Sequence, residues 1–227
     1  MVSLYKYVYK NDVTRVGRGG IFLRRTREQA EKTRSQVLDA SLDMFIENGF
    51  SKTSLTSIAH RLGVTKGAIY WHFKNKEDIL LHIMKRHCGL VLQDAVNSLT
   101  DPQSDDTLYS FYEMVLDRPI SDERYIKLYR LLRENHKWPE EIRTAIFKML
   151  DDVLYHERSI VTDYISRAQE SGMMRGDIEA EKVAVVITAI FNGLGMLQTN
   201  GRLPDEFFKY NKLLFDSFSR TLASLKL

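Results

Sequence analysis

The sequence lacks the features that mark secreted and membrane proteins. Its 227 residues include one cysteine, Cys88, which cannot form an intrachain disulfide and fits a reducing compartment. No apolar run reaches the roughly eighteen residues of a membrane span, and the longest apolar stretch, Val183–Leu197, contains Thr188 and Asn192. Residues 1–20 alternate tyrosine with lysine and lack the apolar segment of a secretory signal. We therefore expect a cytoplasmic, nucleoid-associated protein with no membrane partner.

The motifs of the common enzyme and metal sites are also missing. The sequence contains no P-loop, no G-x-S-x-G and no dinucleotide fingerprint. His156 and Glu157 would begin an H-E-x-x-H zinc motif, but Ile160 occupies the position of the second histidine. His82 and His87 are five residues apart, which places their side chains on different helix faces. We therefore expect no catalytic site, no metal and no cofactor.

Basic residues are concentrated in the first part of the chain. Residues 1–87 hold sixteen Lys and Arg against eight Asp and Glu, whereas residues 88–227 hold seventeen against twenty-two. The net charges are thus +8 and −5, within a total of +3. This asymmetry indicates a small basic module with a polyanionic partner and a larger acidic module with a different task.

Nearly every segment after residue 24 has apolar residues at helical spacing, and no convincing strand pattern occurs, which predicts an all-α fold. Thr53 or Ser54, Thr65, and Asn75 with Asp78 are suited to cap the second, third and fourth helices. Polar breaks are expected at 100–106 and 117–121. The predicted helices are 28–48, 54–62, 66–72, 75–99, 107–117, 122–135, 139–170, 179–198 and 205–225.

The spacing around Gly63 is that of a helix-turn-helix. Two short helices that cross steeply need a small residue at their closest approach, here Ala59, and a glycine in the turn. Val64 and Ile69 then anchor the second helix to the helices that precede it. The sequence therefore predicts a three-helix module that holds residues 66–72 in a fixed pose.

With Ile69 and Phe73 turned inward, the opposite face of this short helix combines aromatic rings with basic groups. Rings and hydroxyls can contact sugars, thymine methyls and phosphates, while lysines supply positive charge. A solvated cap on a helical bundle is the simpler interpretation, but the helix-turn-helix spacing and the basic first module favour DNA binding. The exposed set is Thr65, Lys66, Ala68, Tyr70, Trp71 and His72, with Lys74 and Lys76 following.

The stretch "RTREQAEKTRSQVLDASLDMFIENGFSKTSLTSIAHRLGVTKGAIYWHFKNKEDIL" resembles the DNA-binding region of the TetR family of bacterial transcriptional regulators. It follows the family pattern T-T-x-x-x-I-A-x-x-A-G-V-[ST]-x-G-x-[IL]-Y-x-[HY]-F-x-[NS]-K at nearly every constrained position. The residues of this stretch also resemble the AcrR-type branch of the family, whose members commonly repress multidrug efflux pumps. Leu62 replaces a common alanine, and Ser57 replaces a common acidic capping residue, which is expected to weaken the cap on helix 54–62.

The resemblance implies roles for individual residues of the recognition surface. Lys66, Gly67 and Ala68 are expected to face base edges, and Gly67 lets the backbone approach the groove. The residues implied to hold phosphates are Ser54, Thr65, Tyr70, Trp71, His72 and Lys76.

The basic residues before and at the start of the first helix could form a minor-groove arm. The alternative, that residues 1–22 are a tail without function, is the simpler one. The candidate arm residues are Arg15, Arg18, Arg24, Arg25 and Arg27.

In this family the C-terminal module carries a dimer face and a ligand pocket. The resemblance therefore implies an N-terminal extension 1–23, a helix-turn-helix domain 24–78 and an effector-binding and dimerisation domain 79–227. Two apolar stripes are candidates for the dimer face, although either can also face the monomer core. They are Val183, Ile187, Ile190, Phe191, Leu194 and Leu197 on one helix, and Phe207, Phe208, Leu214, Phe215, Phe218 and Leu222 on the next.

Candidate pocket residues are large aromatic or adaptable apolar side chains in the middle of the acidic module. Each of them is individually also a candidate for the ordinary core, and nothing in the sequence fixes the charge of the ligand. The selected set is Phe111, Met114, Trp138, Phe147 and Leu150.

These observations predict a homodimeric repressor of a multidrug efflux or similar transport operon. It would bind a palindromic operator on double-stranded DNA and leave it when a small lipophilic or aromatic effector tilts the helix 75–99, the expected sole link between the modules. The alternative is a DNA-bound adaptor or activator that contacts another protein and has no small-molecule effector.

Overall fold

The structure is a computed structural model that describes residues 22–100, 106–199, 202–203 and 213. All regular elements among these residues are helical, so the all-α prediction is confirmed for them. They form two compact units, Met1–Gly89 with Leu131–Phe147, and Leu90–Arg130 with Lys148–Leu227. The chain therefore passes from one unit to the other within three helices, which replaces the single link expected at helix 75–99.

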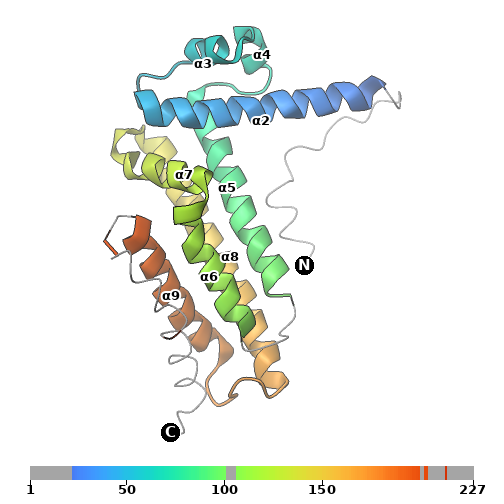
Figure 1. The fold of residues 1–227 in the computed structure, drawn as a ribbon, viewed down its shortest axis with the longest axis vertical. Coiled ribbons are helices and arrows are strands. Elements are labelled where there is room, and N and C mark those ends of the chain that lie inside the picture. Colours follow the sequence, from blue (N-terminus) through green and yellow to red (C-terminus); the bar gives the residue numbers. More distant parts are fainter. Residues whose placement is uncertain (1–21, 101–105, 200–201, 204–212, 214–227) are drawn as a thin grey trace. The chain divides into compact units, whose positions relative to one another are not determined.

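The first unit is built on a long helix, α2 (Phe22–Asn48), with α3 (Leu55–Leu62) and α4 (Lys66–Tyr70) on one side of it (Figure 1). Helix α2 begins six residues before the predicted Glu28, and it includes three of the five arm candidates. The other two candidates, and residues 1–21 of the predicted extension, lie outside the described residues. The core of this unit is formed by apolar side chains that are almost fully buried. They are Leu38, Phe45, Ile58, Ile69, Phe73, Ile79 and Ile83.

Helix α5 (Lys76–Ser98) starts at the predicted cap. The backbone N–H of Asp78 donates to Oδ1 of Asn75 at 2.7 Å, and the Asp78 carboxylate accepts from the backbone N–H of Lys74 at 3.0 Å. This reciprocal arrangement fixes the chain between α4 and α5. Cys88 on α5 is buried, and burial raises the pKa of its thiol to about 12, so the thiol stays protonated and inert.

The second unit contains α6 (Asp106–Ser121), most of α7 (Glu123–Arg133), most of α8 (Glu140–Glu170) and α9 (Ala180–Thr199). A short 3-10 turn, η1 (Asn135–Lys137), precedes α8 and belongs to the first unit. The break predicted at 117–121 is wrong, because α6 continues through it. Pro119 lacks a backbone N–H, so the last turn of α6 forms one hydrogen bond fewer.

Helices α6 and α9 pack together in this unit, and a 2.7 Å hydrogen bond from Nε2 of Gln198 to the carbonyl of Leu116 joins their ends. Their buried faces meet α8 in one apolar core (Figure 1). This core includes Leu108, Phe111, Tyr112, Leu116, Val161, Tyr164, Ile165, Ala184, Ile187 and Phe191.

Helix α9 is apolar on both of its sides. Val183, Ile187 and Phe191 of the predicted stripe face the core of this unit, whereas Val186, Ile190 and others are 39–67% exposed. By length and composition alone, Ala180–Gln198 is long and apolar enough to cross a membrane, which corrects the expectation that this stretch is too short. The core helix of a water-soluble protein passes the same test, and here one side of the helix is part of such a core. All six residues of the second predicted stripe lie outside the described residues.

Candidate nucleic-acid interface

The entry to the two short helices is fixed by serine and threonine hydroxyls. The hydroxyl of Ser54 accepts from the backbone N–H of Ser57 at 3.1 Å, and the hydroxyl of Ser57 accepts from the backbone N–H of Ser54 at 3.0 Å. This capping box confirms a cap at Ser54 and shows that Ser57 performs the role of the usual carboxylate. The expected weakening of the cap relative to an acidic residue stays a prediction, although both hydrogen bonds of the box are formed. The buried hydroxyl of Thr53 donates to carbonyls of Met44 and Gly49 and closes the preceding loop.

The turn between α3 and α4 depends on Gly63. Its φ of 65° and ψ of 27° lie in the left-handed region, where an L side chain is strained. The N–H groups of Gly63 and Val64 then donate to the carbonyls of His60 and Ala59, at 3.2 and 3.1 Å. These bonds end α3 and direct the chain into α4, as the helix-turn-helix spacing predicted.

Helix α4 is short and firmly anchored. Thr65 caps it through a 3.2 Å hydrogen bond from the backbone N–H of Ala68 to its hydroxyl. Ile69 is 0% exposed and Phe73 is 1% exposed, whereas Tyr70 is 51% and Trp71 is 73% exposed. The prediction that the first pair faces inward is confirmed, and two large rings are left facing solvent beside them. Such exposure is costly for a free surface and favours a partner.

Lys66 and Gly67 begin the exposed side of α4. The ammonium of Lys66 lies 5.5 Å from the centre of the Tyr70 ring, a cation–π distance that orients the lysine over its own helix. At Gly67, an added Cβ would meet only the hydroxyl oxygen of Thr65, at 3.8 Å, and the backbone has no positive φ. Nothing in the described part of the protein requires a glycine here.

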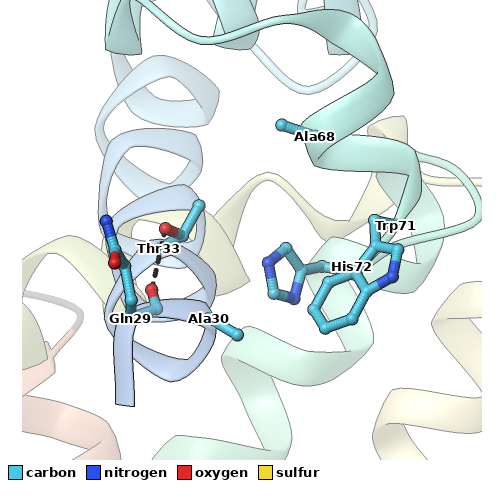
Figure 2. Close-up of a pocket in the computed structure, with 6 residues that line it drawn as sticks. All are labelled: Gln29, Ala30, Thr33, Ala68, Trp71 and His72. Carbon is cyan, nitrogen blue, oxygen red and sulfur yellow. Dashed lines mark hydrogen bonds between the residues drawn. The ribbon is translucent and has the colours of Figure 1, made fainter. Parts of the chain in front are cut away.

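A hollow of about 320 Å³ opens between α2 and the end of α4. Figure 2 shows Trp71 and His72 on one side of it, and Gln29 and Thr33 on the other. The hydroxyl of Thr33 donates to the carbonyl of Gln29 at 3.0 Å, while the Gln29 amide extends from the same helix. Ala30 and Ala68 complete the lining. The hollow thus offers amide, hydroxyl, indole and imidazole groups from two helices.

His72 lies at the edge of the hollow as a neutral ring. Burial, and secondarily the positive charge of Arg34, lower the pKa of His72 below its usual value of 6.5. The Arg34 guanidinium itself lies over the ring of Phe73, 5.6 Å from its centre. Near pH 7 the imidazole therefore offers one N–H donor and one acceptor, and the positive charge at this point comes from arginine.

Lys76 has a structural task in addition to the role implied for it. Its ammonium donates to the carbonyls of Phe50 and Ser51, at 2.9 and 3.0 Å, and lies 4.6 Å from the centre of the Phe50 ring. These bonds use two of its three N–H donors and tie the start of α5 to the loop after α2. One donor is left for a phosphate.

The sequence predicted the residues on and after α4 as one surface, but it gave no sign that α2 lines a hollow beside Trp71 and His72. Gln29 and Thr33 are polar residues four positions apart on a long helix, and this spacing is common on any exposed helix face. Only the folded arrangement shows that they lie opposite Trp71 and His72 (Figure 2).

The five residues selected for a ligand pocket are divided between the two units. Phe111 is 1% exposed in the core of the second unit, Met114 packs against that core, and Leu150 is half-buried in the same unit. Trp138 is buried and Phe147 is 43% exposed, and both belong to the first unit.

Comparison with protein families supports the interpretation of this surface. Residues 37–83 match the model for "Bacterial regulatory proteins, tetR family". The chain is 30% identical to the HTH-type transcriptional regulator TtgR of Pseudomonas putida over 76% of this chain and 82% of TtgR. It is 28% identical to the HTH-type transcriptional regulator AcrR of Shigella flexneri over 75% of this chain and 80% of AcrR.

Solved structures share the fold along most of the chain. NalD, the secondary repressor of the MexAB-OprM multidrug efflux pump in Pseudomonas aeruginosa, superimposes with a TM-score of 0.64 at 25% identity, over 87% of this chain and 98% of NalD. The complex of SmeT with triclosan gives a TM-score of 0.62 at 24% identity, over 83% of this chain and 90% of SmeT.

Proposed function

Because this chain belongs to the TetR family of bacterial transcriptional regulators, within its AcrR-type branch, we propose that it is a homodimeric repressor of an efflux or similar transport operon. It acts in the cytoplasm, binds a palindromic operator through α4 of each subunit, and leaves the operator when a small lipophilic effector binds. NalD, which is named as a repressor of a multidrug efflux pump, supports the choice of target.

The observation that carries this proposal is the exposed face of α4 on a fixed support. Ile69 and Phe73 hold the helix in the core, while Tyr70 and Trp71 face solvent beside Lys66. A rigid helix of this kind can enter a major groove, with lysine at base edges and ring hydroxyl and indole groups on phosphates. The hollow beside Trp71 lets α2 contribute further polar groups to the same backbone strand.

The exposed side of α9 supports a dimer. Val186, Ile190, Gly193 and Leu197 recur at intervals of three and four residues, so they share one helix face away from the core of their unit. An apolar stripe of this kind is stabilised when a second copy covers it. A twofold dimer also supplies the two α4 helices that a palindromic operator needs.

An effector would act by changing the distance between the two α4 helices of the dimer. Two half-sites about one helical turn apart accept only a defined spacing. An effector that binds the second unit more tightly in the released conformation shifts the population away from the operator-bound one. The complex of SmeT with triclosan, a small aromatic compound, supports an effector site in this fold.

The experiment that tests the proposal is a titration of the DNA fragment upstream of the gene with the full chain. Fluorescence anisotropy at low and at moderate salt measures affinity, and sedimentation measures how many copies bind. We expect one dimer per palindromic site, and an affinity that falls steeply with salt. A thermal-shift panel of lipophilic cations, phenolics and acyl compounds then identifies effectors.

A chain that stays monomeric and does not bind its own promoter fragment at low salt would overturn the proposal. Specific binding without any effector response, together with a protein that binds the second unit, would replace the repressor with a DNA-bound adaptor. Increased transcription upon binding would replace it with an activator.

A further inference from the structure

The hollow between α2 and the end of α4 is lined by hydrogen-bond donors that the protein itself does not use. Within the described part of the chain, the amide of Gln29, the indole N–H of Trp71 and the imidazole of His72 have no hydrogen-bond partner. Thr33 differs, because its hydroxyl already donates to the carbonyl of Gln29 at 3.0 Å. Figure 2 shows the Gln29 amide on one side of the hollow and the two rings on the other. An acceptor in the hollow can therefore bind to α2 and α4 at once.

The walls of this hollow suit an anion, because none of its six lining residues is acidic. Arg34 of α2 adds positive charge at His72, and Glu31, which lies 3.7 Å from Arg34, partly offsets it. The charged and titratable groups on the elements around His72 are Glu28, Glu31, Lys32 and Arg34 on α2, Asp78 and His82 on α5, and Lys66, Tyr70 and Lys74 on and after α4. A backbone phosphate of DNA carries one negative charge and only acceptor oxygens, so it matches the donors of the hollow.

His72 is the lining residue whose charge can change. Its ring lies edge-on to the ring of Trp71, with centres 4.5 Å apart and planes at 88°. Burial, and after it the charge of Arg34, lower the pKa of His72, so the imidazole is neutral near pH 7 in the free protein. A negative charge beside the ring favours its protonated form, which has two N–H donors in place of one. The entry of a phosphate and the protonation of His72 therefore favour each other.

We propose that the hollow is the seat of one backbone phosphate of DNA, which Gln29 holds from α2 and His72 holds from the end of α4 as an imidazolium, so that DNA binding takes up a proton. This inference rests on the proposed function in taking duplex DNA as the partner, and it adds a contact from α2 and a pH dependence to it. Because every sequence has the same backbone phosphates, the seat acts on any duplex and fixes where the strand lies relative to α4.

The proton uptake is measured by fluorescence anisotropy of the full chain between pH 8 and pH 5.5 at constant ionic strength. The promoter fragment and an unrelated duplex of the same length are compared. The affinity for both should rise about tenfold as the pH falls, the gain when a neutral hydrogen bond becomes a charge-assisted one. His72→Gln keeps a hydrogen-bond donor and should abolish this rise. His136→Gln changes an exposed histidine of η1 outside the hollow and should retain it.

The contact from α2 is tested by Gln29→Glu, which keeps the shape of the side chain and places a negative charge in the seat. This variant should bind both duplexes at least about tenfold more weakly, because a hydrogen bond to a charged group is lost. Gln36→Glu is the matched control, since it adds the same charge at an exposed position of α2 outside the hollow. It should weaken binding by no more than about threefold.

Three results would each overturn the seat: an affinity that does not change with pH, a His72→Gln chain that keeps the rise, or a Gln29→Glu chain that binds as tightly as Gln36→Glu. A loss confined to the promoter would also contradict it, because it would make Gln29 a residue that reads bases. The unrelated duplex separates this test from that of the proposed function. A chain that shows the seat on both duplexes and does not prefer the promoter would contradict the proposed function alone.

Discussion

The surroundings of α4 in the first unit and the interior of the second unit differ in how their polar side chains are satisfied. Around α4, each hydroxyl that caps a helix has a backbone partner, and the groups left over are exposed rings and a lysine. In the second unit, the Oε1 atom of Glu157 and the hydroxyl of Tyr112 are buried and lack hydrogen-bond partners among the described residues. The first arrangement suits a rigid surface that meets a constant partner, while the second places an energetic cost in the interior of its unit, because a buried polar group without a hydrogen bond is destabilising.

We expect the largest loss of stability from Ile69→Ala, which truncates a side chain on the buried face of α4. Ile69 is fully buried, and its truncation should lower the free energy of unfolding by about 3 to 4 kcal/mol. Leu154→Ala is the matched control, because Leu154 is 44% exposed and its loss should cost less than about 1 kcal/mol. Urea unfolding measures both. Equal costs would contradict the anchored pose of α4.

Glu157→Gln should raise the free energy of unfolding, whereas Ile69→Ala should lower it. The pKa of Glu157 in the folded state is about 7, above the ordinary 4.5, so its burial costs nothing below pH 4.5 and destabilises the fold progressively as the pH rises through 7. The variant should therefore equal the original chain at pH 4.5 and be more stable by up to about 3 kcal/mol at pH 8. Urea unfolding across this range checks it, and Glu170→Gln should show no such change. A pH-independent difference would mean that folding does not shift the pKa of Glu157, and would contradict the prediction.

Two glycine substitutions in the first unit distinguish a residue needed for stability from one expected to affect operator binding. Gly63→Ala places a side chain at a φ of 65° and should cost about 1 to 2 kcal/mol of stability. Gly67→Ala meets no crowding and should be neutral or slightly stabilising, yet it should weaken operator binding if the backbone approaches the groove there. Thermal unfolding and anisotropy, measured on both variants, separate the two roles. A Gly67→Ala chain with unchanged operator affinity would remove this residue from the interface.

The smallest expected effect is a change in which operator sequences the protein prefers to bind. Lys66→Ala should relax the choice among operator sequences more than it lowers the affinity for unrelated DNA, because a base contact distinguishes sequences and a phosphate contact does not. Selection of bound sequences from a random pool provides the measurement. An unaltered set of selected sequences would remove Lys66 from the base-reading residues.

Local chemistry explains why the first unit could be predicted from the sequence. The cap at Ser54, the turn at Gly63 and the inward pair Ile69 and Phe73 each depend on residues within a few positions, so their spacing is visible in the chain. Helix ends were less accurate. Helix α2 starts earlier than expected, and α6 continues through the region of its proline.

The second unit could be predicted only as a set of helices. Glu157 had a visible signal, since it interrupts the apolar row that includes Val153 and Val161, but a single charge in such a row does not show what lies opposite it. The core that α8 shares with α6 and α9 depends on tertiary packing between distant segments. For the same reason, Trp138 and Phe147 looked like companions of Phe111, although they belong to the other unit.

The central claim is that the exposed rings of α4 dock on DNA. Its most direct test compares promoter binding by the double variant Tyr70→Ala, Trp71→Ala with that of Tyr155→Ala, which removes a 62% exposed ring from α8. Unfolding curves verify that both variants are folded. The double variant should then lose about a hundredfold in affinity, because it lacks two contacts to the DNA backbone of roughly 1.4 kcal/mol each. Tyr155→Ala should bind the promoter as tightly as the original chain. A folded double variant that binds the promoter as tightly as the original chain would contradict the account.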